Sequence, residues 1–154
     1  MLRRFPVFGV FGDGRYRLQP IFVDDFAELA MALATSSGDT VVDAIGPETF
    51  TYRELVEVIG DAIGCRRPIG SIPPGLGVAV GRLVGAVVGD VVITPEEVAG
   101  LMQNLLVTAS PPAGHTALTG WVREHRDSPG RRYSSEFARR RDRQRSYEDL
   151  RGRA

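Results

Sequence analysis

The chain is poor in the residues that build covalent cross-links and metal sites. Its 154 residues include one cysteine, Cys65, and no lysine, so all nineteen basic residues are arginine. A single cysteine excludes an internal disulfide and a cysteine-rich metal site. Neither His115 nor His125 has a metal-like or triad-like neighbour in the sequence. We therefore expect no metal site and a reducing compartment, the cytoplasm.

Long hydrophobic runs are also missing. Pro6 and Gly9 interrupt the apolar residues at the N-terminus, so this stretch lacks the continuous apolar segment of a signal peptide. The most apolar stretch, residues 76–93, contains Arg82 and reaches Asp90. Its uninterrupted part is shorter than the roughly 20 residues that cross a bilayer. We expect no stable membrane span and no export.

Charge divides the chain into a body and a tail. Residues 1–130 carry ten arginines against fifteen acids, a net charge of −5, while residues 131–154 carry nine arginines against four acids, a net charge of +5. An Arg-rich tail of this kind can contact nucleic acid, anionic lipid or an acidic partner through charge alone. Because Asp and Glu are mixed into the tail and the whole chain is neutral, a solvated end is favoured and no nucleic-acid partner is expected.

Two interpretations of the first glycines compete. Gly9, Gly12 and Gly14 have the spacing G-x-x-G-x-G, with which some loops approach a dinucleotide pyrophosphate. That chemistry requires a helix to start directly after the glycines, because helix amides hold the phosphate. Here residues 15–23 alternate and then become apolar, which is typical of a strand. The context favours a turn between two extended segments, and we expect no cofactor-binding residues in this chain.

Helix starts are marked at four places. Asp25 with Glu28 has the spacing of an acidic capping box, followed by apolar residues at helical intervals. Thr51–Glu54 and Thr94–Glu97 are full capping boxes, the second with proline at the first helical position. Thr119 is the expected cap of a last helix, on which Trp121 should anchor to the body.

Strands are expected in three further segments. Residues 5–11 are predicted to be extended, and residues 40–45 have the near-continuous apolar character of a strand covered on both faces. The prolines that flank residues 69–72 allow at most a short edge strand there.

Glycine recurs every fourth position in the apolar stretch of residues 76–93, at Gly77, Gly81, Gly85 and Gly89. In a helix these positions form one stripe without side chains, which lets another backbone approach closely. Each helical glycine costs roughly 1 kcal/mol relative to alanine, so packing has to offset that cost. We predict a helix packed at an internal or subunit interface.

Two stretches together resemble a known family. Residues 12–30, G-D-G-R-Y-R-L-Q-P-I-F-V-D-D-F-A-E-L-A, are similar to the segment of extended and atypical short-chain dehydrogenases/reductases, the NAD-dependent epimerase/dehydratase-like proteins, in which a substrate loop leads into a strand ending V-D-D-v-A. Residues 46–59, G-P-E-T-F-T-Y-R-E-L-V-E-V-I, resemble the next landmark, a helix entered through threonine. The resemblance covers roughly residues 5–127 and only the C-terminal portion of the family.

The resemblance implies a particular fold. It implies an α/β architecture with the late strands and helices of a partial Rossmann-like sheet, followed by a mostly helical, substrate-side subdomain. We assign these parts to residues 1–130 and leave residues 131–154 as the Arg-rich tail. The family's cofactor loop and its Tyr-x-x-x-Lys pair belong to an N-terminal half that has no counterpart here. Without lysine the pair cannot form, so we assign no catalytic residue.

Function, on this resemblance, would reside in the loop before the V-D-D strand. Family members use an Arg or Gln there to bind an anionic or hydroxylated group, and the matching positions are Arg15, Arg17 and Gln19. Alternation places these three side chains on one face of an extended segment. They are our predicted substrate-binding residues, and an exposed polar strand edge is the equally weighted alternative.

Two functions from different classes follow. In the first, the chain is the substrate-side part of an NAD(P)-dependent oxidoreductase or epimerase that acts on a carbonyl or sugar-like small molecule, and it is inactive without the N-terminal half. In the second, it is a non-catalytic interaction module, comparable to superfamily members that sit on respiratory complexes. A homo-oligomer is also possible, because unpaired strands near Ile21 and Val41 would expose sheet edges.

Overall fold

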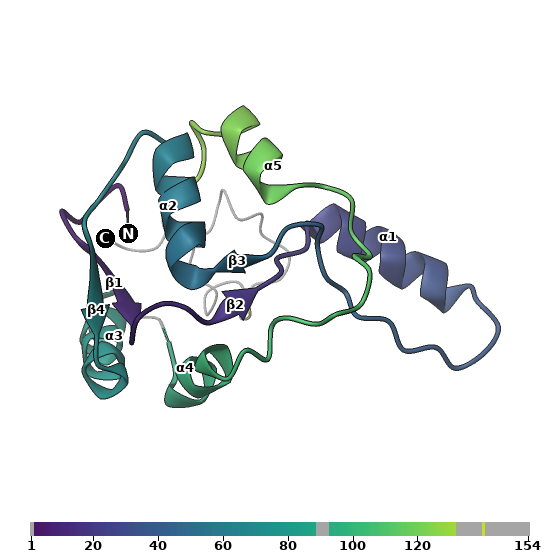
Figure 1. The fold of residues 1–154 in the computed structure, drawn as a ribbon, viewed down its shortest axis with the longest axis horizontal. Coiled ribbons are helices and arrows are strands. Elements are labelled where there is room, and N and C mark those ends of the chain that lie inside the picture. The colour runs from purple at the N-terminus through teal and green to yellow at the C-terminus, as the bar shows by residue number, and fades with distance from the viewer. Residues whose placement is uncertain (1, 89–92, 132–139, 141–154) are drawn as a thin grey trace.

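The computed structural model describes residues 2–88, 93–131 and 140, which form a mixed α/β fold (Figure 1). In chain order the elements are β1 (Phe8–Phe11), β2 (Arg17–Leu18), α1 (Val23–Ala34), β3 (Phe50–Thr51), α2 (Tyr52–Ala62), β4 (Ile69–Ile72), α3 (Pro74–Val88), α4 (Pro95–Met102) and α5 (Leu118–Glu124). Among these described helices, none is both long and apolar enough to cross a membrane. The Arg-rich tail lies almost entirely outside the described residues.

Two small sheets organise the body. β1 and β4 pair in parallel, with Phe8 opposite Ile69 and Phe11 opposite Ile72. The amide of Gly12 donates to the Ile72 carbonyl at 2.9 Å and so continues this ladder. These pairings confirm the expected extended segment before Gly12 and the short strand at residues 69–72. β2 and β3 form an antiparallel pair beside them.

Helices α2 and α4 begin as the sequence predicts. The Thr51 hydroxyl accepts from the Glu54 amide at 3.2 Å, and the Glu54 carboxylate accepts from the Thr51 amide at 2.8 Å. Thr94 and Glu97 make the same reciprocal pair. Each pair satisfies two backbone donors that a helix start leaves without an intrahelical partner.

The predicted start of α1 is wrong. Its N-cap is Phe22, which makes no side-chain cap hydrogen bond, and Asp25 is buried instead of capping the helix with Glu28. The strand expected near Ile21 is also absent, since β2 ends at Leu18 and the chain from Gln19 to Phe22 is not in a strand. Pro20 lacks an N–H group, so it cannot donate to a ladder here.

The strand predicted over residues 40–45 does not form. Val41 is 98 % exposed and Val42 is 40 % exposed, so neither side chain has the cover that a buried strand needs. An arm projects from the body at the right of Figure 1. It consists of α1, which leads outward, and of the segment after α1, including residues 40–45, which returns to the body. Asp43 holds its end by accepting hydrogen bonds from the hydroxyls of Thr108 and Ser110 at 2.8 and 2.5 Å.

The glycine stripe of α3 packs against the body. A Cβ atom on Gly77 would overlap the ring of Phe11 in β1, and one on Gly81 would lie 2.7 Å from the Ile93 side chain. Both glycines are buried. This confirms a packed helix at an internal interface for these two positions, while Gly89 lies outside the described residues.

Helix α5 packs beside α2 (Figure 1). Its N-cap is Ala117 and not the predicted Thr119, whose amide and hydroxyl instead donate to the Glu48 carboxylate at 2.9 and 2.6 Å. A carboxylate from elsewhere in the chain thus replaces the local cap. Trp121 anchors the helix as expected, with its ring 6.0 Å from that of Phe22.

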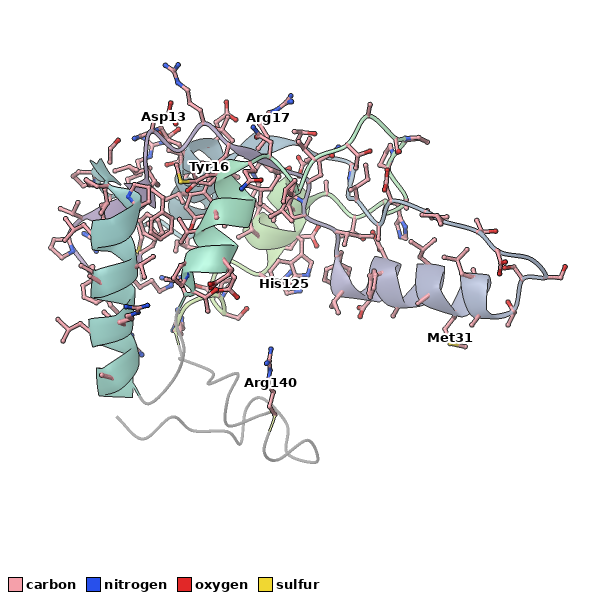
Figure 2. All side chains as sticks on the ribbon, turned by 90° about the horizontal axis from the view of Figure 1, so that it is seen from below. Asp13, Tyr16, Arg17, Met31, His125 and Arg140 are labelled. Atoms are coloured by element: carbon pink, nitrogen blue, oxygen red, sulfur yellow. The ribbon has the colours of Figure 1, made fainter. Side chains whose placement is uncertain are left out.

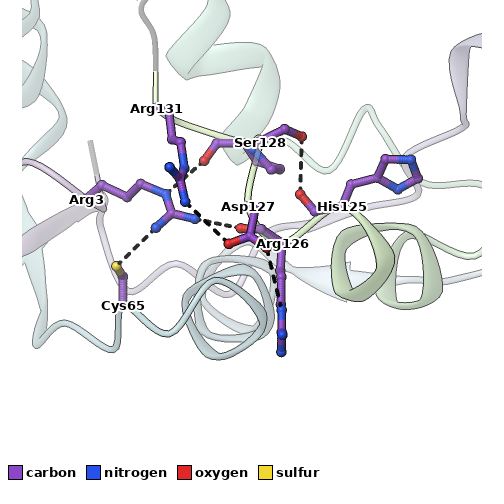
Figure 3. Close-up of polar contacts among 8 residues, drawn as sticks. Arg3, Cys65, His125, Arg126, Asp127, Ser128 and Arg131 are labelled. Atoms are coloured by element: carbon purple, nitrogen blue, oxygen red, sulfur yellow. Dashed lines mark hydrogen bonds and ion pairs between the residues drawn. The ribbon is translucent and has the colours of Figure 1, made fainter.

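Arg3 joins the first residues to the segment after α5 (Figure 3). Its guanidinium donates to the carbonyls of Arg126 and Pro129 at 2.6 and 3.0 Å, and a third nitrogen lies 3.9 Å from the Cys65 sulfur. One arginine side chain therefore donates hydrogen bonds to two backbone carbonyls that follow the end of α5 and have no partner within the helix.

The packing of α3 on β1 predicts opposite effects for two glycines of the same helix. Gly77→Ala forces the Phe11 ring to shift and should lower the free energy of unfolding by about 1–3 kcal/mol, the usual cost of overpacking. Gly75→Ala is the matched control, because its Cβ meets no atom within 4 Å, and alanine should leave stability unchanged or raise it. Urea unfolding followed by circular dichroism compares the two. Equal changes would contradict the packing described.

Candidate functional site

The predicted substrate loop is a glycine turn between two strands. Gly12 and Gly14 have φ values of 58° and 73°, in the left-handed region that favours glycine. The Asp13 carboxylate between them accepts from the Arg15 amide at 2.9 Å. The chain then enters β2 and not a helix, so the prediction of a turn between extended segments is confirmed.

The first turn of α2 holds this loop. The Tyr52 amide donates to the Tyr16 carbonyl at 2.9 Å, and the Arg53 amide donates to the Gly14 carbonyl at 3.1 Å. These helix-start amides are therefore committed to loop carbonyls. The Arg53 side chain adds a bond to the Asp13 carbonyl at 3.3 Å.

Tyr16 fixes the inner side of the loop. Only 5 % exposed, its ring stacks on Tyr52 with centroids 5.4 Å apart. Its buried hydroxyl has no hydrogen-bond partner among the described residues. Burial, helped by the nearby Tyr52, raises the pKa of Tyr16 to about 12. At neutral pH this phenol keeps its proton, so Tyr16 is not set up as a general base.

The outer side of the loop is joined to the segment after α4. The Arg17 amide donates to the Asn104 side-chain oxygen at 2.6 Å, and the Gln19 amide donates to the Leu106 carbonyl at 3.0 Å. The Thr108 amide in turn donates to the Gln19 side-chain oxygen at 2.8 Å. Residues 104–108 thereby run parallel to residues 17–19 and fix their backbone.

The three predicted substrate residues have different surroundings. Arg15 and Arg17 are exposed, whereas Gln19 is half-buried and bonded to Thr108. The Arg15 side chain is 85 % exposed and its guanidinium lies 3.6 Å from the Asp13 carboxylate, an ion pair that contributes little in water. Figure 2 shows Asp13 and Arg17 along the same outer edge of the molecule, with Tyr16 turned inward. Within the part of the chain that the structure describes, the Arg17 guanidinium makes no hydrogen bond or ion pair.

A second polar centre, around Asp25, was missed by sequence reasoning. The Asp25 carboxylate accepts from the His115 amide at 2.7 Å, from the Thr116 amide at 2.7 Å and from the Thr116 hydroxyl at 2.8 Å. The His115 ring nitrogen Nε2 lies 3.4 Å from the same carboxylate. Four groups that are distant in sequence from α1 thus converge on one buried side chain.

The pKa of Asp25 reflects two opposing effects. Burial disfavours the charged form and raises the pKa, but the hydrogen bonds from Thr116 and His115 and the charge of the His115 ring outweigh it. The net result is a pKa below the ordinary value for aspartate. Asp25 therefore remains a carboxylate at neutral pH and acts as an acceptor, not as an acid.

Close backbone contacts surround this carboxylate. A Cβ atom on Gly114 would lie 3.0 Å from the Asp25 carboxylate and 2.8 Å from the Ile21 side chain, and one on Gly46 would overlap the Pro20 carbonyl oxygen. The Gly114 amide also donates to the Ile45 carbonyl at 3.0 Å. Glycine is needed at both positions because three chain segments meet there.

An apolar pocket of about 200 Å³ opens beside the Asp25 centre. Its lining residues are Pro20, Ile21, Phe22, Val23, Thr116, Leu118 and Trp121. The first of these lining residues, Pro20, directly follows Gln19 in the sequence. Phe22 and Trp121 form two aromatic walls of the pocket. Such a surface can receive an apolar group and supplies no acid or base.

The described residues contain no group of three or more His, Cys, Asp or Glu side chains that could hold a metal ion. Comparison with known proteins leaves the family open, since no protein-family model matches the chain and no curated protein matches its sequence. The site is therefore interpreted from its own geometry.

The Asp25 centre predicts an acid-sensitive stability. Because the folded-state pKa is lowered, this carboxylate stabilises the fold above its unfolded pKa and loses that effect as the pH falls through the folded value, below about pH 4. Asp25→Asn should lower the melting temperature at pH 7 by about 5 °C or more and flatten the decline of stability that sets in near pH 4 and continues below it.

Asp24→Asn is the control for this experiment, because the neighbouring Asp24 is exposed and holds none of the groups that bind Asp25. Thermal unfolding of the three proteins across this pH range gives the comparison. If Asp24→Asn and Asp25→Asn behave alike, the buried carboxylate does not stabilise the fold in the way described.

Proposed function

We propose that this chain is the substrate-side part of an NAD(P)-dependent short-chain dehydrogenase/epimerase-like protein. The observation that carries the proposal is the pair of exposed arginines, Arg15 and Arg17, on a loop whose backbone is fixed from both sides. A guanidinium can bind a carboxylate or phosphate at two points. A loop that is already ordered loses little conformational entropy when it does so.

Gln19 has a different role in this proposal from the one its sequence position implies. Its side-chain oxygen is bonded to Thr108, so it positions the loop and leaves anion binding to the two arginines. The apolar pocket beyond Gln19 supplies cover for the uncharged part of a sugar-like or carbonyl substrate.

The parallel pair of β1 and β4 also supports the proposal. Parallel strands occur mainly in larger sheets that are covered on both faces, whereas this described sheet has two strands. A larger sheet, such as that of a Rossmann-like domain, would supply the further strands that a parallel pair of this kind normally has beside it. In the intact relative, NAD or NADP and the catalytic pair would belong to those further strands, and hydride transfer would occur at their junction with this chain.

A non-catalytic assembly module is the second candidate. One observation favours it: α1 presents a broad apolar face with no cover among the described residues. In this alternative the loop arginines have no binding role, and the arm is the surface that contacts another protein.

Cofactor titration tests whether this chain can bind NAD(P) and act as an enzyme by itself, which the proposal does not expect. Fluorescence titration of the purified chain with NADH and NADPH should show no saturable binding up to millimolar concentration, and no dehydrogenase activity, because the glycine turn leads into a strand and offers no helix N-terminus for a pyrophosphate. Saturable binding near micromolar concentration would contradict this account and make the chain a candidate enzyme by itself.

Anion binding tests the substrate loop on the same sample. Glucose 1-phosphate, monitored by amide chemical shifts, should perturb residues 12–19 with millimolar affinity, and Arg17→Ala should weaken that binding by about tenfold. Arg126→Ala is the control, since it removes an exposed arginine that also lies beside an aspartate. If both variants weaken glucose 1-phosphate binding equally, the loss of one positive charge explains the effect. That result would contradict the proposed subsite.

A further inference from the structure

Helix α1 lacks the packing that normally stabilises a helix. Of its 12 residues only Asp25 is buried, and no side chain caps its N-terminus. A helix of this length is marginal in water unless an apolar face packs against something. Within the described parts of the chain, Asp25 bonds α1 to residues 115 and 116, and Leu29 and Leu33 are half-buried.

One exposed side of α1 is apolar. Its residues follow one another at intervals of three and four, the spacing of a helix-packing face. We call this set the α1 face: Val23, Phe26, Ala27, Ala30, Met31 and Ala34, all of them exposed. Val23 is 67 % exposed, Phe26 49 % and Met31 68 %. Figure 2 shows Met31 pointing away from the rest of the molecule.

The composition of the α1 face suits another helix. Ala27, Ala30 and Ala34 keep its centre shallow, so a second helix can approach closely, while Phe26 and Met31 are the bulky side chains that such a helix would receive. In Figure 1 the helix lies on the arm that projects from the body, so the described elements do not block the approach.

We propose that the α1 face is the contact surface of a homodimer, in which α1 packs antiparallel on α1 of a second copy, centred on Ala30. In this arrangement Phe26 lies opposite Ala34 of the partner subunit, so a large side chain meets a small one on each side of the two-fold axis.

Charge favours the antiparallel over the parallel orientation of the two helices. The exposed acids of α1, Asp24 and Glu28, lie in its first half, and residues 29–34 carry no charge. An antiparallel pair therefore sets each acidic half against an uncharged half, whereas a parallel pair would bring like charges together. The antiparallel pair also opposes the two helix dipoles.

The dimer should be weak. Stable interfaces bury about 1,200 Å² or more in total, and two 12-residue helices supply only part of that area. Val41 and Val42, on the segment that returns along the arm, expose further apolar surface. We expect a dissociation constant in the range of roughly 1–100 µM.

One pair of substitutions in the same helix tests the proposal. Ala30→Glu places a charge at the centre of the α1 face, and Ala32→Glu places the same charge on an exposed position of the opposite side. Sedimentation equilibrium of the full chain should show a monomer–dimer equilibrium for the parent and for Ala32→Glu, and at least a tenfold weaker dimer for Ala30→Glu. Circular dichroism should show the same helix content in both variants.

Cross-linking gives a second, independent readout. In a Cys65→Ser background, Ala30→Cys should form a disulfide-linked dimer under mild oxidation, whereas Ala32→Cys should not. A parent that stays monomeric up to several hundred micromolar, or equal behaviour of the two positions in both assays, would overturn the proposal.

Discussion

The arrangement of this chain depends on one buried carboxylate. Asp25 lies in the first turn of α1, yet it bonds to residues 115 and 116, ninety positions further along. These bonds join the arm to the segment that leads into α5. Gly46 and Gly114 leave room for the three backbones that meet beside it. A lowered pKa keeps the side chain charged, so its acceptor role is permanent at neutral pH.

That carboxylate also determines which surfaces remain for function. Helix α1 is joined to the body through the buried Asp25, with Leu29 and Leu33 half-buried on the same side, whereas the residues of the α1 face are exposed. On the other side of the body, the loop of Arg15 and Arg17 is fixed by α2 and by residues 104–108, so its two guanidiniums stand on an ordered backbone. Within the described residues, the apolar α1 face and the cationic loop are thus supported by separate sets of contacts.

Local features could be predicted from the sequence, and features that depend on distant partners could not. The capping boxes at Thr51 and Thr94 involve residues three positions apart, and the glycine turn is set by two left-handed residues. Asp25 looked like a helix cap because its true partners lie ninety residues away. Residues 40–45 looked like a strand because apolar character does not reveal whether a neighbouring strand exists. In the candidate site, alternation placed Arg15, Arg17 and Gln19 on one face, but nothing local showed that Thr108 would bind Gln19 and leave only the two arginines exposed.

The most direct measurement of the central claim is hydrogen exchange, by NMR, of the amides of His115 and Thr116. Both donate to the Asp25 carboxylate in a segment without regular secondary structure. We predict that they exchange as slowly as amides of α2 at pH 6, since they open only when the junction opens. Exchange at the rate of an unprotected loop, with α2 still protected, would show that Asp25 does not hold the structure together.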